Sequence, residues 1–191
     1  NFININGQDI LVEILKNKTQ VIFISGHFNN FELMAQYIEK SNIKLAAIYR
    51  PLNNFFLNNT MEEIRKKFIC KKQIKKGLSG TREVLKHIND GYSIALMIDQ
   101  RVSEGIKVDF FNRKALTTTI PAQLIKKYKL NVVPVHIERQ NKHYFNLCFN
   151  KPIIFDPSDD VEKITLKLNK NLEKMILKNP SQWIWSHNRW K

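Results

Sequence analysis

The chain has 191 residues, 43% of them apolar, which is enough to bury the core of one ordinary domain and excludes intrinsic disorder. Its 31 basic and 17 acidic side chains give a net charge of +14, which attracts polyanions such as nucleic acid, anionic lipid or acidic proteins. A biased genome composition would also explain this excess of Lys. Cys70 and Cys148 lie far apart and in no metal-binding motif, which excludes a disulfide scaffold and a zinc module.

Short β-branched runs alternate with amphipathic stretches in the first half of the chain, a pattern typical of α/β domains. The order begins as strand, helix, strand, and Asp90-Gly91 marks the end of a later helix. The expected elements are a strand at 21–25, a helix at 31–40, a strand at 44–49, helices at 54–68 and 81–89, and a strand at 93–98.

The alternation continues in the second half of the chain, where Pro121 falls in the first turn of a helix and is compatible with it. The expected elements are a strand at 108–111, a helix at 119–128, strands at 132–137 and 144–149, and a helix at 161–177. Together they predict a single α/β domain over residues 1–191, with a mixed, mostly parallel sheet flanked by helices. No apolar run approaches the roughly 20 residues of a membrane-spanning helix.

Polar residues follow three of the apolar strands, at the edge where open α/β sheets bind ligands. They are His27, Asn30 and Glu32 after the first strand, Arg50 after the second, and Asp99 after the strand at 93–98.

The spacing of His27 and Glu32 limits how these two side chains can meet. On one regular helix they would point about 140° apart, so His27 must lie in the turn before the helix, which Gly26 permits. Glu32 would then fold back, orient the imidazole and make His27 a general base for a hydroxyl. The alternative interpretation is that His27 caps the turn and Glu32 is a solvated helix residue.

Six sequence blocks in a fixed order carry a resemblance to a known family: GHFNNFE, IYRP, MIDQ, VDFFNRKALTTTIPAQL, VVPV and PSQWIWSHNRWK. They resemble the bacterial lipid A late acyltransferases, also called the lauroyl/myristoyl acyltransferases, within the glycerolipid acyltransferase group that shares an H-x4-D/E block. The resemblance implies that a fatty acyl chain passes from acyl carrier protein to a hydroxyl of a lipid A precursor. It also implies action at the cytoplasmic face of the bacterial inner membrane.

The resemblance implies roles for the residues that follow the strands. His27 would deprotonate the acceptor hydroxyl as it attacks the thioester carbonyl, and Glu32 would orient and stabilise the imidazolium. Arg50 would bind a phosphate or the oxyanion, and Asn30 would contact substrate. Asp99 would hold Arg50 or position a sugar hydroxyl, unless it only caps its loop. Acyl transfer from a thioester needs a base, an oxyanion site and positioning, so we expect no metal and no cofactor.

Three positions depart from the usual blocks of this family. Asn29 and Phe31 replace Gly and Trp in the first block, and Asn112 stands where Gly is usual in a later one. Asn tolerates left-handed backbone geometry, and Phe keeps the aromatic ring while losing the indole N–H. The family's N-terminal apolar anchor has no counterpart in this sequence, so we expect a membrane-anchoring segment upstream of it.

The basic segment at 65–76 would face anionic lipid headgroups or the acidic carrier protein, or be plain solvated surface. The aromatic end around Trp183 and Trp190 would pack the sheet or line the acceptor side.

Two other functions are alternatives to the lipid A acyltransferase. One is an enzyme of the same fold acting on another glycolipid or a lysophospholipid, and the other is a non-catalytic module that binds nucleic acid. No helix-turn-helix, zinc-finger or RRM signature supports a nucleic-acid partner. For the acyltransferase reaction, we expect an apolar cleft that holds the acyl chain and opens at His27 and Glu32.

Overall fold

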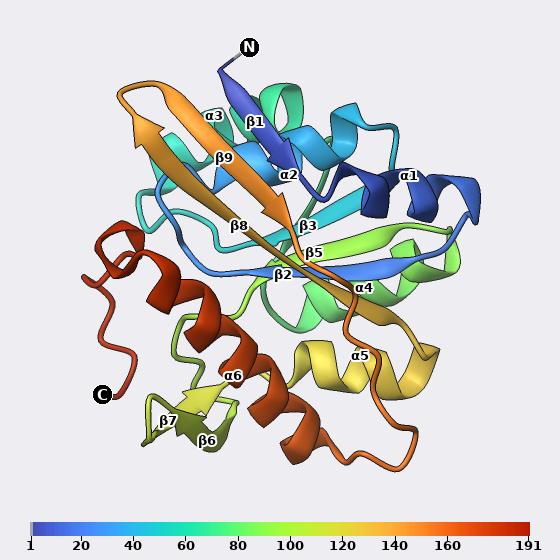
Figure 1. Ribbon diagram of the computed structural model, residues 1–191, viewed down its shortest axis with the longest axis vertical. Coiled ribbons are helices and arrows are strands. Elements are labelled where there is room, and N and C mark those ends of the chain that lie inside the picture. Colours follow the sequence, from blue (N-terminus) through green and yellow to red (C-terminus); the bar gives the residue numbers. More distant parts are fainter. Residues whose placement is uncertain (1) are drawn as a thin grey trace.

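A seven-stranded sheet forms the centre of the computed structural model, which describes residues 2–191 (Figure 1). Its strands are β1 (Ile3–Asn6), β2 (Val21–Ser25), β3 (Leu45–Tyr49), β4 (Lys72–Lys75), β5 (Ser93–Met97), β8 (Asn131–Asn141) and β9 (Tyr144–Phe149). Across the sheet their order is β1-β9-β8-β2-β5-β3-β4, and β8 and β9 form its antiparallel pair, the other neighbours being parallel. The mixed, mostly parallel sheet predicted from the sequence is confirmed.

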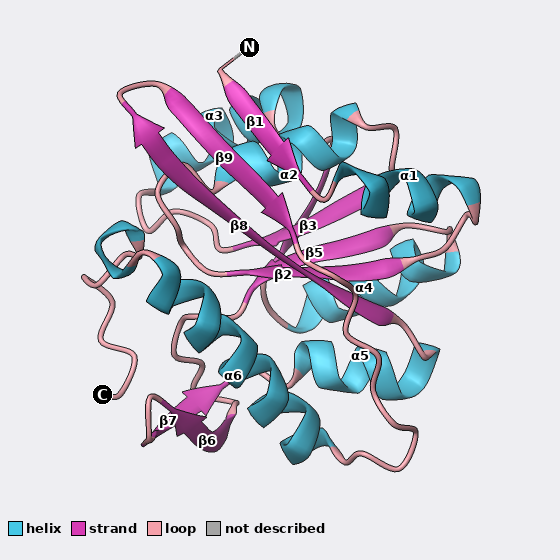
Figure 2. Cartoon of the chain, in the orientation of Figure 1, coloured by secondary structure: helices cyan, strands magenta, loops and turns pink. Residues whose placement is uncertain are grey.

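Helices cover both faces of this sheet (Figure 2). They are α1 (Gln8–Lys16), α2 (Glu32–Lys40), α3 (Phe55–Phe68), α4 (Leu78–Asn89), α5 (Ile120–Tyr128) and α6 (Val161–Lys178). The first three lie on one face and the last three on the other. Right-handed crossovers produce this division, because the chain moves across the sheet from β2 to β4 and then returns to β5 and β8.

A separate hairpin packs against α6, away from the main sheet. Its strands β6 (Ile106–Phe110) and β7 (Arg113–Thr117) are antiparallel. The two residues between them, Phe111 and Asn112, have φ angles of 50° and 59°, as a type I′ turn requires. The 3-10 helix η1 (Pro180–Gln182) then leads into the C-terminal segment.

Some short elements were not predicted from the sequence, namely β1, α1, β4 and β7. The edge strands β1 and β4 are four residues each, and β4 buries only Ile74, so their sequences carry little apolar pattern. Helix α4 also begins at Leu78, three residues before the predicted start.

The register between β2 and β5 determines what lies at the carboxyl edge of the sheet. Ser25 is paired with Met97 in the parallel ladder, and the Ile98 N–H donates to the Ser25 carbonyl. His27 and Asp99, each two residues beyond this pair, therefore lie beside one another where the chain leaves the sheet. Among residues 2–191, no helix combines the length and the apolar composition needed to span a membrane.

Candidate active site

His27 and Asp99 form a directly hydrogen-bonded pair where β2 and β5 end. His27 Nδ1 lies 2.7 Å from Asp99 Oδ1, and the backbone N–H of His27 donates to Asp99 Oδ2 at 2.7 Å. The Trp183 indole Nε1 donates to the same Oδ2 at 2.9 Å. Asp99 is 3% exposed, whereas 19% of the His27 side chain is accessible. The Asp99 carboxylate is thus buried, and the His27 imidazole lies closer to solvent.

The charge state of Asp99 fixes the proton position on His27. Burial acts to raise the pKa of Asp99, but the hydrogen bonds and charge of His27, together with the Trp183 N–H, outweigh it and lower the pKa. An ionised carboxylate only accepts hydrogen bonds, so the proton of the pair resides on Nδ1 and donates to Asp99. The lone pair of a neutral His27 is therefore on Nε2, the arrangement of a general base.

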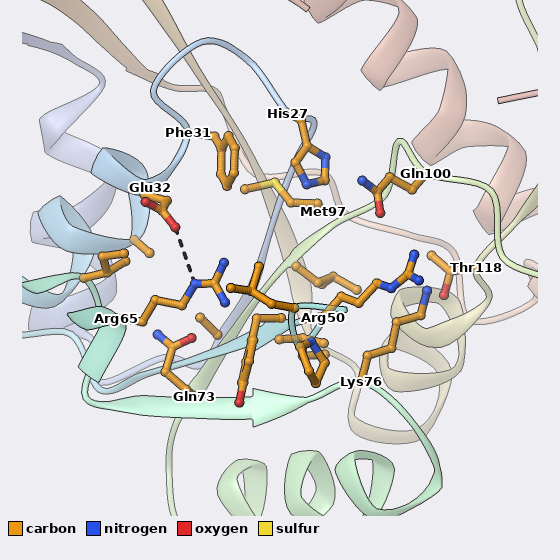
Figure 3. Close-up of a pocket in the computed structure, with 18 of the residues that line it drawn as sticks. His27, Phe31, Glu32, Arg50, Arg65, Gln73, Lys76, Met97, Gln100 and Thr118 are labelled. Atoms are coloured by element: carbon orange, nitrogen blue, oxygen red, sulfur yellow. Dashed lines mark hydrogen bonds and ion pairs between the residues drawn. The ribbon is translucent and has the colours of Figure 1, made fainter. Parts of the chain in front are cut away.

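Glu32 does not contact His27, which corrects the predicted pairing. Its Oε1 accepts from Arg65 Nε at 3.5 Å, and Figure 3 shows the Phe31 ring between the Glu32 and His27 side chains. The Phe31 and His27 rings meet edge to face with centroids 4.8 Å apart. Glu32 is the first residue of α2 and points toward α3, whereas the sheet register brings Asp99 to His27.

The loop that carries His27 is held by close packing and by the C-terminal segment. Gly26 does not have a positive φ; an added Cβ there would lie 3.0 Å from Leu172 Cδ1 and 3.3 Å from Asp99 Oδ2. Asn29 has a φ of 35°, in agreement with Asn standing for Gly at that position. Backbone N–H groups donate from Asn29 to Gln182 and from Ile184 to His27.

A cavity of about 410 Å³ opens beside His27, as the predicted apolar cleft requires (Figure 3). Most of its wall is apolar, formed by Phe31, Ala35, Ala47, Ile48, Pro51, Leu52, Ile69, Leu96, Met97, Val102 and Ile120. Glu32 and Arg50 also line it, with Arg65 and Lys76. An extended apolar ligand with an anionic group suits such a lining.

A second, more polar cavity of about 230 Å³ lies on the Asp99 side of His27. It is lined by His27, Asp99, Gln100, Trp183, Ile184, Ser186 and His187. His27, Gln100 and His187 line both cavities. The imidazole is therefore accessible from two directions, so two different groups can approach it.

Arg50 and Lys76 bring two positive charges into the larger cavity, where Figure 3 shows their head groups on the same side near Thr118. Burial lowers the pKa of Lys76, and the charge of Arg50 adds to that effect against the opposing charge of Glu104. Within residues 2–191 no acid forms an ion pair with Arg50, whose Nη2 donates to Asn53 Oδ1 at 3.4 Å. Asp99 does not hold Arg50.

The predicted site residues thus divide into three groups. His27 and Asp99 are in contact, and Glu32 and Arg50 line the larger cavity beside them. Asn30 is exposed and lines neither cavity, so its contact with substrate stays a prediction. In the described part of the chain, no cluster of three or more His, Cys, Asp or Glu side chains is placed to hold a metal ion.

Several side chains at the site were not assigned to it from the sequence. Arg65 and Lys76 were seen only as part of a basic segment, and Trp183 was expected to pack the sheet or line the acceptor side. Trp183 is 4% exposed and donates to Asp99. A buried indole N–H needs an acceptor, which was the available signal that Trp183 would contact a polar group.

Sequence comparisons relate this chain to known proteins. A family model described as bacterial lipid A biosynthesis acyltransferase matches residues 1–191. The lipid A biosynthesis acyltransferase 2 of Shigella flexneri is 24% identical over 183 residues, and the lipid A biosynthesis myristoyltransferase of Escherichia coli (strain K12) is 22% identical over 182. Both alignments cover 94% of this chain but 58% and 56% of those relatives, so the chain spans less than three fifths of their length.

Among solved structures, the 1-acyl-sn-glycerophosphate acyltransferase PlsC from Thermotoga maritima is similar, with a TM-score of 0.55 and 14% sequence identity. The match covers 95% of this chain and 73% of that one. This likeness confirms the predicted glycerolipid acyltransferase-like fold.

Proposed function

The chain belongs to the bacterial lipid A biosynthesis acyltransferase family, as its sequence blocks predicted, and we propose that it transfers a fatty acyl chain to a lipid A precursor. The proposed donor is the thioester of acyl carrier protein, and the proposed acceptor is a hydroxyl of the precursor. The observation that supports this most directly is the His27–Asp99 pair at the wall of an apolar cavity. It supplies a base next to space for an acyl chain.

In the proposed reaction, His27 Nε2 removes the proton from the acceptor hydroxyl while the oxygen attacks the thioester carbonyl. The tetrahedral intermediate collapses, the C–S bond breaks, and an ester C–O bond remains. The imidazolium returns its proton to the leaving sulfur. Asp99 keeps Nδ1 protonated and stabilises the positive ring through its 2.7 Å hydrogen bond.

The two cavities offer places for the two substrates. The larger one would hold the acyl chain, because each buried methylene contributes about 0.8 kcal/mol to binding. Arg50, with Lys76 beside it, would bind a phosphate of either substrate or the oxyanion, since neither charge is neutralised by an ion pair with a described acid. Glu32 would act through Arg65, its partner at the cavity wall, as a positioning residue.

The proposed place of action is the cytoplasmic face of the bacterial inner membrane, where an anionic lipid surface and an acidic carrier protein would both attract a chain of charge +14. The basic residues at 65–76 are the proposed contact with these partners.

Mass spectrometry of lipid products tests this function. Purified protein is incubated with a tetraacylated lipid A precursor and acyl carrier protein thioesters of defined length, with lysophosphatidic acid as a competing acceptor and acyl coenzyme A as a competing donor. We expect acylated lipid A precursor with the carrier protein donor, and a rate lower by roughly 10²–10⁴-fold for His27→Ala. Circular dichroism verifies that the variant is folded. Exclusive acylation of lysophosphatidic acid, or full activity of a folded His27→Ala protein, would contradict the proposal.

A further inference from the structure

Helix α3 presents its polar residues to the protein interior. Asn58 Nδ2 donates to Glu62 Oε1 at 2.7 Å, and Lys75 Nζ of β4 lies 3.0 Å from the same oxygen. Glu62 also accepts from the Tyr49 hydroxyl of β3, and these hydrogen bonds lower its pKa to about 2. The side chains of Glu62 and Arg65 are 13% and 15% exposed. This helix is therefore fixed to β3 and β4 by polar contacts.

Four apolar residues of α3 form a stripe on another side of the helix. Leu57, Met61, Ile64 and Phe68 follow the spacing i, i+4, i+7, i+11, which aligns them in one stripe about 100° from the inward-facing polar residues. Leu57 is 54% exposed, Ile64 40% and Phe68 53%, and no described side chain of this helix is buried. Helices of soluble domains normally bury such a stripe, so this one is available to a partner.

Positive charge borders the stripe. Lys67 lies about 90° around the helix from the centre of the stripe, and Lys71 and Lys72 follow the C-terminal end of the helix. All three are exposed, and none of them forms an ion pair with a described acid. Lys67 Nζ lies 5.2 Å from the Phe68 ring centre, so cationic and apolar groups are adjacent. An apolar stripe edged by lysines is complementary to the boundary between anionic headgroups and acyl chains of a lipid bilayer.

We propose that α3 binds the surface of an anionic bilayer, with Leu57, Ile64 and Phe68 inserted among the acyl chains and the neighbouring lysines on the headgroups. Leu52, Arg65 and Ile69 line the 410 Å³ cavity, so the bound helix would place the cavity mouth at the membrane surface. A lipid substrate could then pass between bilayer and cavity without crossing water. The passage of substrate rests on the proposed function, whereas binding of the helix does not.

Flotation with lipid vesicles tests the surface with matched variants. Vesicles of phosphatidylcholine are compared with vesicles containing phosphatidylglycerol. Leu57→Glu and Phe68→Glu are compared with Leu177→Glu, which alters a residue that is 63% exposed on α6, a helix on the opposite face of the sheet from α3. We expect binding that requires phosphatidylglycerol and falls at least ~10-fold for each α3 variant, with the Leu177 variant unchanged. The double variant Lys67→Glu/Lys71→Glu should also lose at least ~10-fold. Equal losses in the α3 and Leu177 variants, or no vesicle binding by the unaltered chain, would overturn the inference.

Spin-label depth measurements test the orientation without disrupting the surface. Leu57→Cys and Leu177→Cys are prepared in a Cys148→Ser background, in which Cys70 is 0% exposed and remains unlabelled. A nitroxide at position 57 should become accessible to oxygen and protected from a water-soluble nickel complex on vesicles, and one at 177 should not. Solvent-like accessibility at both positions would reject insertion. Acyl transfer in detergent micelles reports the proposed function separately, because it needs no bilayer.

Discussion

His27 is hydrogen-bonded to a carboxylate that follows a strand, Asp99, rather than to the one in its own sequence block. Asp99 meets it because β5 lies beside β2, and Trp183 completes the surroundings of that carboxylate. An imidazole held through Nδ1 has its orientation and tautomer fixed before substrate arrives. Glu32 is paired with Arg65 at the wall of the larger cavity instead.

This difference predicts unequal effects of two amide substitutions. Asp99→Asn removes the negative charge, lets the ring adopt the other tautomer and should reduce kcat by ~10²–10⁴-fold. Glu32→Gln keeps a hydrogen-bond acceptor for Arg65 and should cost less than ~10-fold, mainly in KM. Steady-state acyl transfer with both purified variants measures the contrast. A larger kcat loss in Glu32→Gln than in Asp99→Asn would return the orienting role to Glu32.

His136 lies outside the proposed active site and makes the stability of the folded protein depend on pH. It is 3% exposed on β8, and burial with the nearby charge of Lys178 lowers its pKa from 6.5 to about 4. Below pH 6.5 the unfolded chain binds a proton that the folded chain excludes, so stability is complete above that pH and falls toward pH 4. We expect the free energy of unfolding to drop by about 2 kcal/mol between pH 7 and 5 from this group.

Urea denaturation at pH 7 and pH 5 measures the effect. His136→Gln should reduce the drop by that amount, whereas the exposed control His143→Gln should leave it unchanged. The same pH dependence in all three proteins would show that His136 titrates alike in both states.

At the scale of elements, the central strands were predictable from the sequence, whereas the edge strands β1 and β4 were not. The five residues of β2 are all buried, and the uninterrupted apolar run of its first four residues is visible in the sequence. The edge strand β1 alternates Ile and Asn over four residues, a pattern too short to identify a strand.

The sequence predicted that His27, Arg50 and Asp99 lie at one edge of the sheet, but it did not predict which of them contacts His27. That contact depends on the strand order, because β5 lies between β2 and β3 although it follows β4 in the chain. The geometry of a single helix, from which the His27–Glu32 pairing was predicted, contains no information on strand order.

The β6–β7 hairpin offers a test of its turn chemistry. Asn112 has a φ of 59°, and the preceding Phe111 N–H donates to Glu173 Oε1 of α6 at 2.7 Å, so the turn geometry is tied to the core. Asn112→Val should destabilise the protein by ~1–2 kcal/mol, because a β-branched residue is strained at positive φ. Asn112→Gly should be neutral or slightly stabilising. Chemical denaturation compares them, and an equal cost for both would mean that backbone strain is not the determining factor.

For the molecule as a whole, the net charge of +14 is a property that sequence analysis could not assign to a partner. Electrostatic attraction acts over a Debye length, which shrinks from about 30 Å at 0.01 M salt to about 8 Å at 0.15 M. If the charge serves docking of the acidic carrier protein, added salt will weaken the encounter of the two proteins. It will leave His27 and Asp99 unaffected, because their contact is short and Asp99 is buried.

The prediction is that KM for an acyl carrier protein thioester rises at least ~5-fold between 0.01 and 0.15 M salt while kcat stays constant. An acyl pantetheine thioester, which lacks the acidic protein, should show little change in KM over the same range. The pair of donors separates docking from chemistry, since both deliver the same thioester to the same base. Salt dependence that is identical for the two donors would mean that the charge does not act on the carrier protein.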